Sequence, residues 1–233
     1  MQTTYLTQSR AECPKSLLRH LGDDAPERLT AIGDVELLSH KNLAIFCSAK
    51  CPGSIILKIY DLARELREQG TTVIGGFHSP IEKEVLNVLL RGEGSMILCP
   101  ARGIEKMRIR REYRGPVNKG RLLLLSALPE KVRRPTAATA LFRNRLVAAL
   151  AESILIAYAA PGSKTEAFAR ELLSWHKPLY TFDDPNNENL IRPRSVRRDG
   201  TKERFISLAS GSLGSICGES GAGLRPIMPN GGL

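Results

Sequence analysis

The sequence predicts an α/β fold: a Rossmann-like, doubly wound and mostly parallel sheet of about six strands, preceded by a short helical lead-in. Two observations support this class. From residue 43 onward, short apolar runs alternate with amphipathic segments, as expected for strand–helix units around a parallel sheet. The apolar runs also lack the polar alternation of a half-exposed strand, so helices should cover both of their faces.

Six segments have the length and aliphatic content of buried strands. They are LAIFCS (43–48), TTVIGG (71–76), SMILCP (95–100), RLLLLS (121–126), SILIAYA (153–159) and PLYTF (178–182). Helices are expected between them. The first has apolar residues at helical spacing from Ile55 to Leu66 and ends at Gly70, a C-terminal signal. Ser79-Pro80 reads as an N-cap followed by proline in the first turn of a second helix. Residues 136–150 and 163–175 supply two more.

Composition divides the chain into three parts. Residues 1–40 form a separate, partly helical lead-in that ends in a turn at Gly33-Asp34, and residues 41–191 form the Rossmann-like domain. Residues 192–233 are first basic and then rich in glycine and serine, without periodicity, so this tail is expected to be disordered.

The charge balance favours an anionic partner. Lys and Arg exceed Asp and Glu by 34 to 24, giving a net charge of +10, which raises the local concentration of polyanions. A basic surface that serves only solubility is the alternative. Aromatic residues make up 5% of the chain, too few for a surface built from many base-stacking rings. Contacts to phosphates are therefore expected to dominate.

Several classes of protein are disfavoured by the same sequence. No apolar run approaches the roughly 20 residues that span a bilayer, and the N-terminus lacks a signal peptide, so we expect a cytoplasmic protein without membrane contact. The five cysteines are scattered, without CxxC pairs, so no metal site is expected. The loop after the first strand is not GxGxxG, so the standard NAD pattern is absent and no cofactor is expected.

Candidate site residues follow the strands, because ligands of open parallel sheets bind beyond the carboxyl ends of the strands. The loops there are rich in small residues and lead into helix N-termini, where backbone N–H groups attract anions. The candidates are Ser48, Lys50 and Gly53 after the first strand, Gly76, His78 and Ser79 after the second, and Gly162, Ser163, Lys164 and Thr165 after the fifth.

Arg143, Asn144 and Arg145 complete the candidate set, in the helix before the fifth strand. Arginine binds phosphate oxygens through two parallel hydrogen bonds, and asparagine both donates and accepts. Two residues apart on a helix is about 200° around its axis, so the two arginines cannot face one phosphate. One is expected to face the anion and the other to brace the fold.

Two other features lie on the same predicted edge. His78 and Glu82 stand one helical turn apart, as an acid–base pair would, but a solvated loop histidine is the more frequent case. No catalytic residue is therefore assigned. The basic run MRIRREYRG, after Ala101-Arg102-Gly103, is a second candidate DNA surface. The PGSKT loop lacks the full Walker pattern, so ATP hydrolysis is not predicted.

These motifs, in this order, resemble the DNA-processing protein A family, called DprA or Smf. FRNRLVAALAESILIAYAAPGSKTEAFARELLSWHKPLY is similar to the family's R-N-R run, the strand after it and its SGSLxTA loop. GGFHSPIEKE lies in the place of its SGxAxGID segment, with Glu82 near the acidic position, and LAIFCSAKCPGS in that of VAIVGSRxxTxYG. CPKSLLRHLGDDAPERLTAIGDVELL resembles the family's lead-in. The resemblance covers about residues 13–191.

The chain departs from this pattern in the first loop, where Cys47 and Ala49 replace the family's glycine and arginine, leaving Lys50 as the nearest base. No winged-helix domain is expected after the core. The resemblance implies single-stranded DNA binding, a homodimer, and assistance in loading the RecA recombinase during DNA uptake, transformation or recombination.

Two alternatives to this non-enzymatic, DNA-binding function stay open. A nucleotide phosphoribohydrolase of the LOG type has a similar fold and a PGGxGTxxE motif, which residues 161–166 match in part. That motif needs a glycine pair and a glutamate three residues after its threonine, whereas here one glycine is present and Glu166 is adjacent. A nucleotide-sensing module would use the same pocket.

Overall fold

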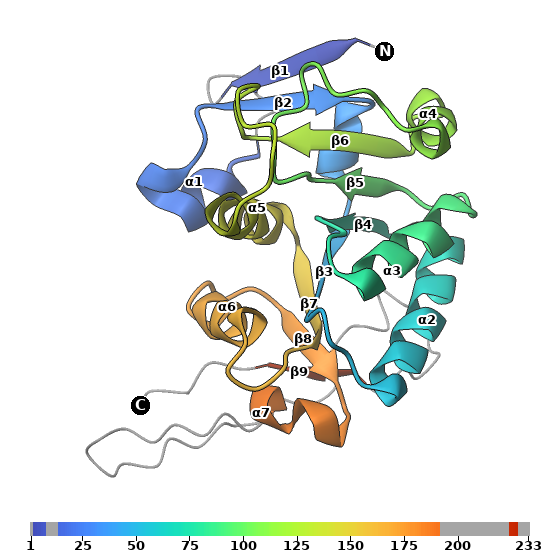
Figure 1. Ribbon diagram of the computed structural model, residues 1–233, viewed down its shortest axis with the longest axis vertical. Coiled ribbons are helices and arrows are strands. Elements are labelled where there is room, and N and C mark those ends of the chain that lie inside the picture. The colour runs from blue at the N-terminus through green and yellow to red at the C-terminus, as the bar shows by residue number, and fades with distance from the viewer. Residues whose placement is uncertain (1, 8–13, 192–223, 228–233) are drawn as a thin grey trace.

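A nine-stranded sheet forms the centre of the molecule, in the order β1-β2-β6-β5-β4-β3-β7-β8-β9 (Figure 1). The computed structural model describes residues 2–7, 14–191 and 224–227. Six adjacent strands are parallel: β6 (Leu122–Ser126), β5 (Met96–Leu98), β4 (Thr72–Gly75), β3 (Asn42–Cys47), β7 (Ser153–Tyr158) and β8 (Leu179–Phe182). The predicted fold class and all six predicted strands are confirmed.

The strand order reverses between β3 and β7. From β3 the sheet runs through β4, β5 and β6 in one direction and through β7 and β8 in the other. The loops after the neighbouring strands β3 and β7 therefore lead in opposite directions. Open α/β sheets bind their ligands at such a point. This switch point positions the candidate site.

The lead-in differs from the separate segment expected from the sequence. Helix α1 (Ser16–Leu21) is present, with short 3-10 turns at Gly22–Asp24 and Val35–Ser39. However, β1 (Thr3–Thr7) and β2 (Arg28–Ile32) join the central sheet, because β2 pairs antiparallel with both β1 and β6. The expected turn lies at Gly33, whose φ is 119°.

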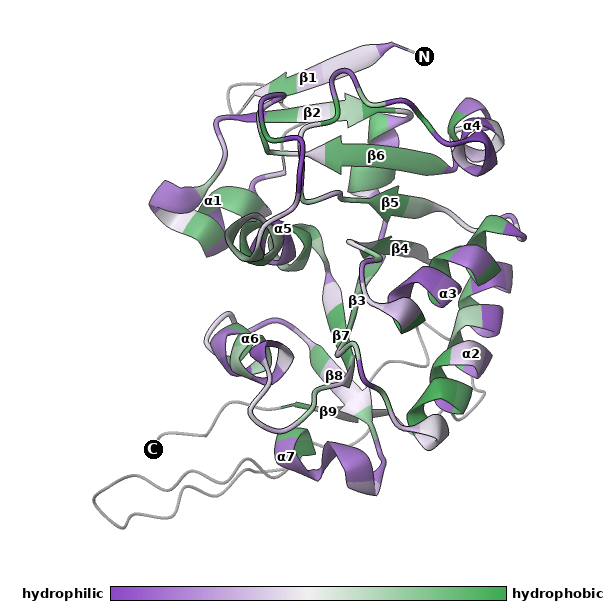
Figure 2. Cartoon of the chain, viewed as in Figure 1, coloured by the Kyte–Doolittle hydropathy of each residue, from purple (hydrophilic) through white to green (hydrophobic). Residues whose placement is uncertain are grey.

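Helices cover both faces of the sheet, as the apolar strands require. Helices α2 (Gly53–Glu68), α3 (Pro80–Leu90) and α4 (Arg111–Asn118) pack on one face, and α1, α5 (Ala137–Leu150) and α6 (Lys164–Leu173) on the other. Strand β3 shows the division, since Leu43 and Ile45 enter one core and Ala44 and Phe46 the other. The six parallel strands are accordingly mostly apolar, while α2 and α3 carry polar stripes (Figure 2). The four predicted helices are confirmed, and α4, which was not predicted, begins within the basic run MRIRREYRG.

Segments near the C-terminal end of the sequence form the sheet edge at β8 and β9. A 3-10 turn (Pro185–Asn187) and α7 (Glu188–Ile191) follow β8, and β9 (Leu224–Pro226) pairs antiparallel with β8. The predicted disordered tail, 192–233, lies outside the described residues except for 224–227. Across the described ranges, no helix is long and apolar enough to cross a membrane.

Candidate nucleic-acid interface

Ser48 ties together the two loops at the switch point. Its backbone N–H donates to the carbonyl of Tyr158 at 2.9 Å, and its Oγ accepts from the N–H of Ala160 at 3.1 Å. The Ser48 hydroxyl also lies 3.4 Å from that of Ser163. Ser48 is only 6% exposed, so it holds the loops after β3 and β7 in one arrangement. Two residues predicted from separate motifs are thus brought into contact.

Two exposed lysines flank this contact. Lys50 lies two residues after Ser48, and Lys164, next to Ser163, is the first residue of α6. Helix α2 begins nearby at Gly53, and a hydrogen bond from the N–H of Glu166 to the Ser163 hydroxyl caps α6. Helix N-termini carry partial positive charge, which adds to that of the lysines. This edge of the sheet is therefore suited to an anion.

The PGSKT loop is closed by its own glutamate. Gly162 adopts the left-handed conformation, with φ of 72°, and its N–H donates to Oε2 of Glu166 at 2.8 Å. Glu166 is buried and also accepts from Asn189 and Arg170. Burial raises the pKa of this carboxyl, but the hydrogen bonds from Asn189 and Gly162 and the charge of Arg170 together lower it by more. The net shift of the pKa is therefore downward. A carboxylate with this many partners closes the loop, which does not favour the phosphoribohydrolase alternative.

Glu82 clamps the loops after β3 and β4. Its Oε1 accepts from the N–H of Cys47 at 3.0 Å, and its Oε2 accepts from the N–H groups of His78 at 2.8 Å and Ser79 at 3.4 Å. The Ser79 hydroxyl in turn accepts a hydrogen bond from the N–H of Glu82, which completes the capping box of α3. The sequence analysis treated Glu82 as a possible acid–base partner of the exposed His78 and as the match to an acidic family position; its buried carboxylate binds and orders the backbone of both loops.

Arg143 lies buried at the ends of β4 and β5. Its Nη1 donates to the carbonyl of Cys99 at 3.0 Å and its Nε to Oδ1 of Asn144 at 2.9 Å. A methyl group at Gly76 would overlap its guanidinium, so this glycine leaves the space the side chain occupies. Burial lowers the pKa of Arg143, and the nearby Glu82 opposes that shift.

Arg145 points toward another helix. It forms a two-bond ion pair with Glu171 of α6 and so braces α5 against α6. This arrangement is the bracing role expected for one of the two arginines. Arg143, however, is only 5% exposed and its neighbour Asn144 is half-buried, so neither is a freely exposed phosphate ligand. Contact between Arg143 and an anion stays a prediction, as does the role of the half-buried Thr165.

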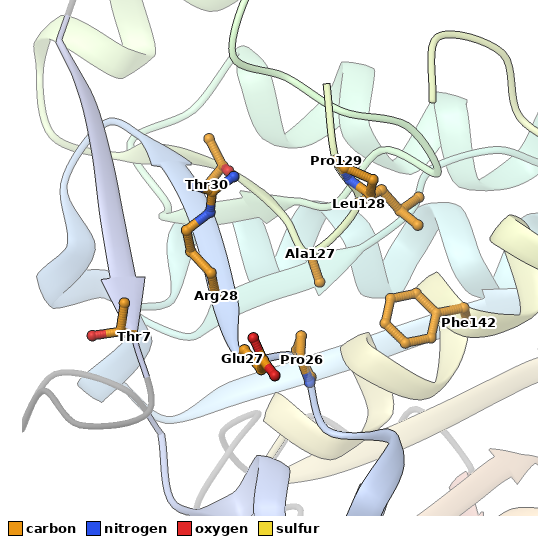
Figure 3. A pocket seen from close by; sticks show the side chains of 9 residues that line it. All are labelled: Thr7, Pro26, Glu27, Arg28, Thr30, Ala127, Leu128, Pro129 and Phe142. Atoms are coloured by element: carbon orange, nitrogen blue, oxygen red, sulfur yellow. The ribbon is translucent and has the colours of Figure 1, made fainter. Parts of the chain in front are cut away.

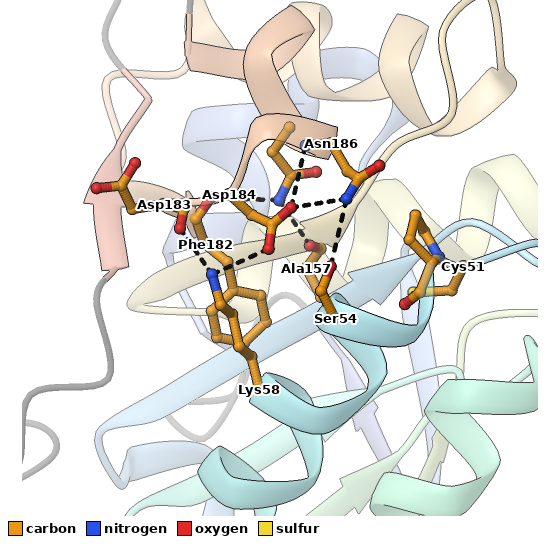
Figure 4. A network of polar contacts seen from close by, with 10 residues as sticks. Cys51, Ser54, Lys58, Ala157, Phe182, Asp183, Asp184 and Asn186 are labelled. Atoms are coloured by element: carbon orange, nitrogen blue, oxygen red, sulfur yellow. Dashed lines mark hydrogen bonds and ion pairs between the residues drawn. The ribbon is translucent and has the colours of Figure 1, made fainter.

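A polar network that the sequence did not signal anchors the first turns of α2. Asp184, after β8, pairs with Lys58 at 3.0 Å, and Asn186 donates to Oδ1 of Asp184 and to Oγ of Ser54 (Figure 4). Burial raises the pKa of Asp184, but hydrogen bonds from Asn186, Lys58 and Ser54 outweigh it and bring the pKa to about 2. The network holds α2, and the loop before it, against β8.

Metal ligands do not gather at this edge. In the described ranges, no three His, Cys, Asp or Glu side chains lie close enough to hold an ion. Cys47 and Cys51 lie against each other, and this contact, together with burial, raises the pKa of the Cys47 thiol.

Comparison with known proteins agrees with the observed fold. The model of the family "DNA recombination-mediator protein A" matches residues 4–196. No curated protein matches the sequence. The fold resembles that of DNA processing protein A from Helicobacter pylori, described for its single-stranded DNA binding mode, with 23% identity, a TM-score of 0.64 and coverage of 80% of this chain and 83% of that one.

DNA processing protein A (DprA) from Streptococcus pneumoniae is similar too, with 17% identity and a TM-score of 0.65. That match covers 78% of this chain but 64% of the pneumococcal one, so the present chain spans less than two thirds of it. The family model, in contrast, matches most of the chain, from β1 to beyond α7. The chain belongs to the DNA recombination-mediator protein A family.

Proposed function

We propose that the edge of the sheet around Ser48 and Ser163 binds the phosphates of single-stranded DNA. One observation carries the proposal: Lys50, Lys164 and the N-termini of α2 and α6 all lie within a few residues of the Ser48–Ser163 contact. This concentration of positive charge at the edge where open α/β sheets bind ligands supports the proposal. The net charge of +10 supports the same partner.

Binding of this kind relies on phosphates and carries little sequence information. In this arrangement, the loops are held from the inside by Ser48, Glu82 and Arg143. The DNA strand is contacted by Lys50 and Lys164. Charged side chains that release counterions supply the affinity, which therefore falls with salt. Gly53, Gly76, Gly162 and His78 contribute backbone and loop surface at the same edge.

The family gives this binding its biological setting. We infer a non-enzymatic mediator that presents single-stranded DNA to a recombinase of the RecA type, acts in the cytoplasm and works as a homodimer. Family membership supports the proposed recombinase, dimer and compartment.

A competition experiment tests the proposal. Single-stranded and double-stranded DNA of equal length are titrated with the protein at several salt concentrations, beside a nucleotide-monophosphate hydrolysis assay. We expect tighter binding to the single strand, an affinity that falls steeply with salt, and no hydrolysis. Hydrolysis, or equal and salt-independent binding of both forms, would contradict it.

A further inference from the structure

A cavity of about 580 Å³ opens at the same edge of the sheet, between β2, the loop after β6 and helix α5 (Figure 3). Ala127 and Leu128 follow β6 directly, and Thr30, which pairs with Ser126 of that strand, lines the cavity from β2. Phe142 lines it from α5 and directly precedes Arg143. Helix α5 therefore connects this cavity to the loops of the phosphate site.

The cavity has apolar walls. Pro26, Leu128, Pro129 and the ring of Phe142 contribute them, and Figure 3 shows the Phe142 ring beside Leu128 and Ala127. Burying such walls against a flat apolar surface is favourable, and an aromatic ring can stack on another ring. The lining therefore fits a planar heterocycle better than an extended phosphodiester.

Two carboxylates and one guanidinium, those of Glu27, Glu105 and Arg28, lie in the lining or directly behind it. Glu27 carries an exposed carboxylate in the lining. Behind Arg28 and Thr30 lies Glu105, whose Oε1 accepts from both, at 3.2 and 3.4 Å. Its Oε2 is buried and has no hydrogen-bond partner within the described part of the chain. Ionised carboxylates only accept hydrogen bonds, so they suit a ligand that donates.

Arg28 does not reverse this balance. Its guanidinium pairs with Glu105 and lies 4.7 Å from the ring centroid of Tyr5, so part of its charge is already compensated. The Glu27 carboxylate would repel a phosphate at this position, whereas the amino group of a base would be attracted to it.

From this geometry we infer that the cavity receives one nucleobase that carries an exocyclic amino group, from the strand whose phosphates lie at the Ser48–Ser163 edge. The base stacks on Phe142, and its amino group donates to Glu27. This inference rests on the proposed function. It adds a modest preference at one nucleotide to binding that is otherwise carried by phosphates.

Cytosine and uracil provide a matched test, because the amino group at C4 of cytosine is a carbonyl oxygen in uracil. Short deoxycytidine and deoxyuridine oligomers of equal length are titrated with the full chain at one salt concentration. We expect the deoxycytidine oligomer to bind about fivefold more tightly, as one hydrogen bond to a charged acceptor allows. Equal affinities would overturn the inference.

Variants locate the preference. Glu27→Ala and Phe142→Leu should each reduce the preference for deoxycytidine to less than about twofold, since they remove the acceptor and the flat ring. Glu36→Ala and Leu141→Ala change exposed side chains of the same lead-in and helix that do not line the cavity, and should retain the preference. A preference that survives both cavity variants would overturn the inference.

An abasic oligomer separates this inference from the proposed function. It keeps the phosphates and lacks the bases, so salt-dependent binding of this oligomer supports the phosphate site independently of the cavity. If it binds and deoxycytidine shows no advantage over deoxyuridine, only the base cavity is wrong. If neither it nor any oligomer binds, the proposed function fails and the inference fails with it.

Discussion

Arg145 of α5 donates to both carboxylate oxygens of Glu171 on α6, with Nε–Oε1 and Nη2–Oε2 distances of 2.7 and 3.2 Å. Two residues earlier, Arg143 turns the other way and is buried at the ends of β4 and β5. Neighbouring arginines of one helix thus have different structural surroundings, and substitutions should separate them.

Arg145→Ala should lower stability without a large loss of DNA affinity. The side chains of the pair are about one third exposed, so we expect a loss of about 1 kcal/mol in the free energy of unfolding. Denaturant unfolding of Arg145→Ala, Glu171→Ala and the double variant measures the coupling. Loss of DNA binding with unchanged stability would show instead that Arg145 contacts the ligand.

Gly76→Ala should destabilise the protein through Arg143. The added methyl group overlaps the guanidinium, which must give up its bond to the Cys99 carbonyl, at a cost of about 1–3 kcal/mol. In an Arg143→Ala background the overlap disappears, so Gly76→Ala should there cost little more. Gly53→Ala is the control, because nothing lies within 4 Å of the added methyl group. Fully additive losses would contradict this account.

Asp184→Asn should weaken the anchoring of α2 in a pH-dependent manner. The pKa of Asp184 in the folded protein, about 2, lies below its ordinary value of 3.8. Its charged form therefore contributes stability above pH 3.8, and this contribution is lost as the pH falls through about 2. We expect a loss of about 1–3 kcal/mol at neutral pH from the weakened Lys58 and Asn186 contacts.

Unfolding of the wild type and of Asp184→Asn, followed between pH 2 and pH 7, checks this expectation. The two stability curves should converge toward the acid end. A difference that stays constant over the whole range would mean that the charge of Asp184 is not what matters.

The central fold was predictable because its strands and helix starts are marked by short segments of neighbouring residues. The uniformly apolar runs identified the six parallel strands, and Ser79-Pro80 marked the start of α3. The angular separation of residues on a helix indicated that Arg143 and Arg145 would differ. The serines of two loops, Ser48 and Ser163, were selected for their positions after strands, and they do meet.

What sequence reasoning missed depends on contacts between distant segments. Glu82 binds the backbone of Cys47, 35 residues away, and Asp184, after β8, pairs with Lys58 of α2. The spacing of Ser79 and Glu82 is that of a capping box, but nothing near Glu82 indicates its bond to Cys47. The strands of the lead-in were missed for a similar reason: β1 is short and mostly polar, and it is held by pairing with β2.

The salt dependence of single-stranded DNA binding by a Lys50→Ala/Lys164→Ala variant tests the central claim most directly. Each phosphate neutralised on a single strand contributes about 0.7 to the slope of log affinity against log salt, so the double variant should lose about 1.4 of the wild-type slope together with affinity. Lys41→Ala, at the opposite edge of the sheet before β3, should match the wild type. If the double variant keeps both the affinity and the slope of the wild type, the Ser48–Ser163 edge is not the DNA site, and the basic run from Arg102 to Arg114 becomes the better candidate.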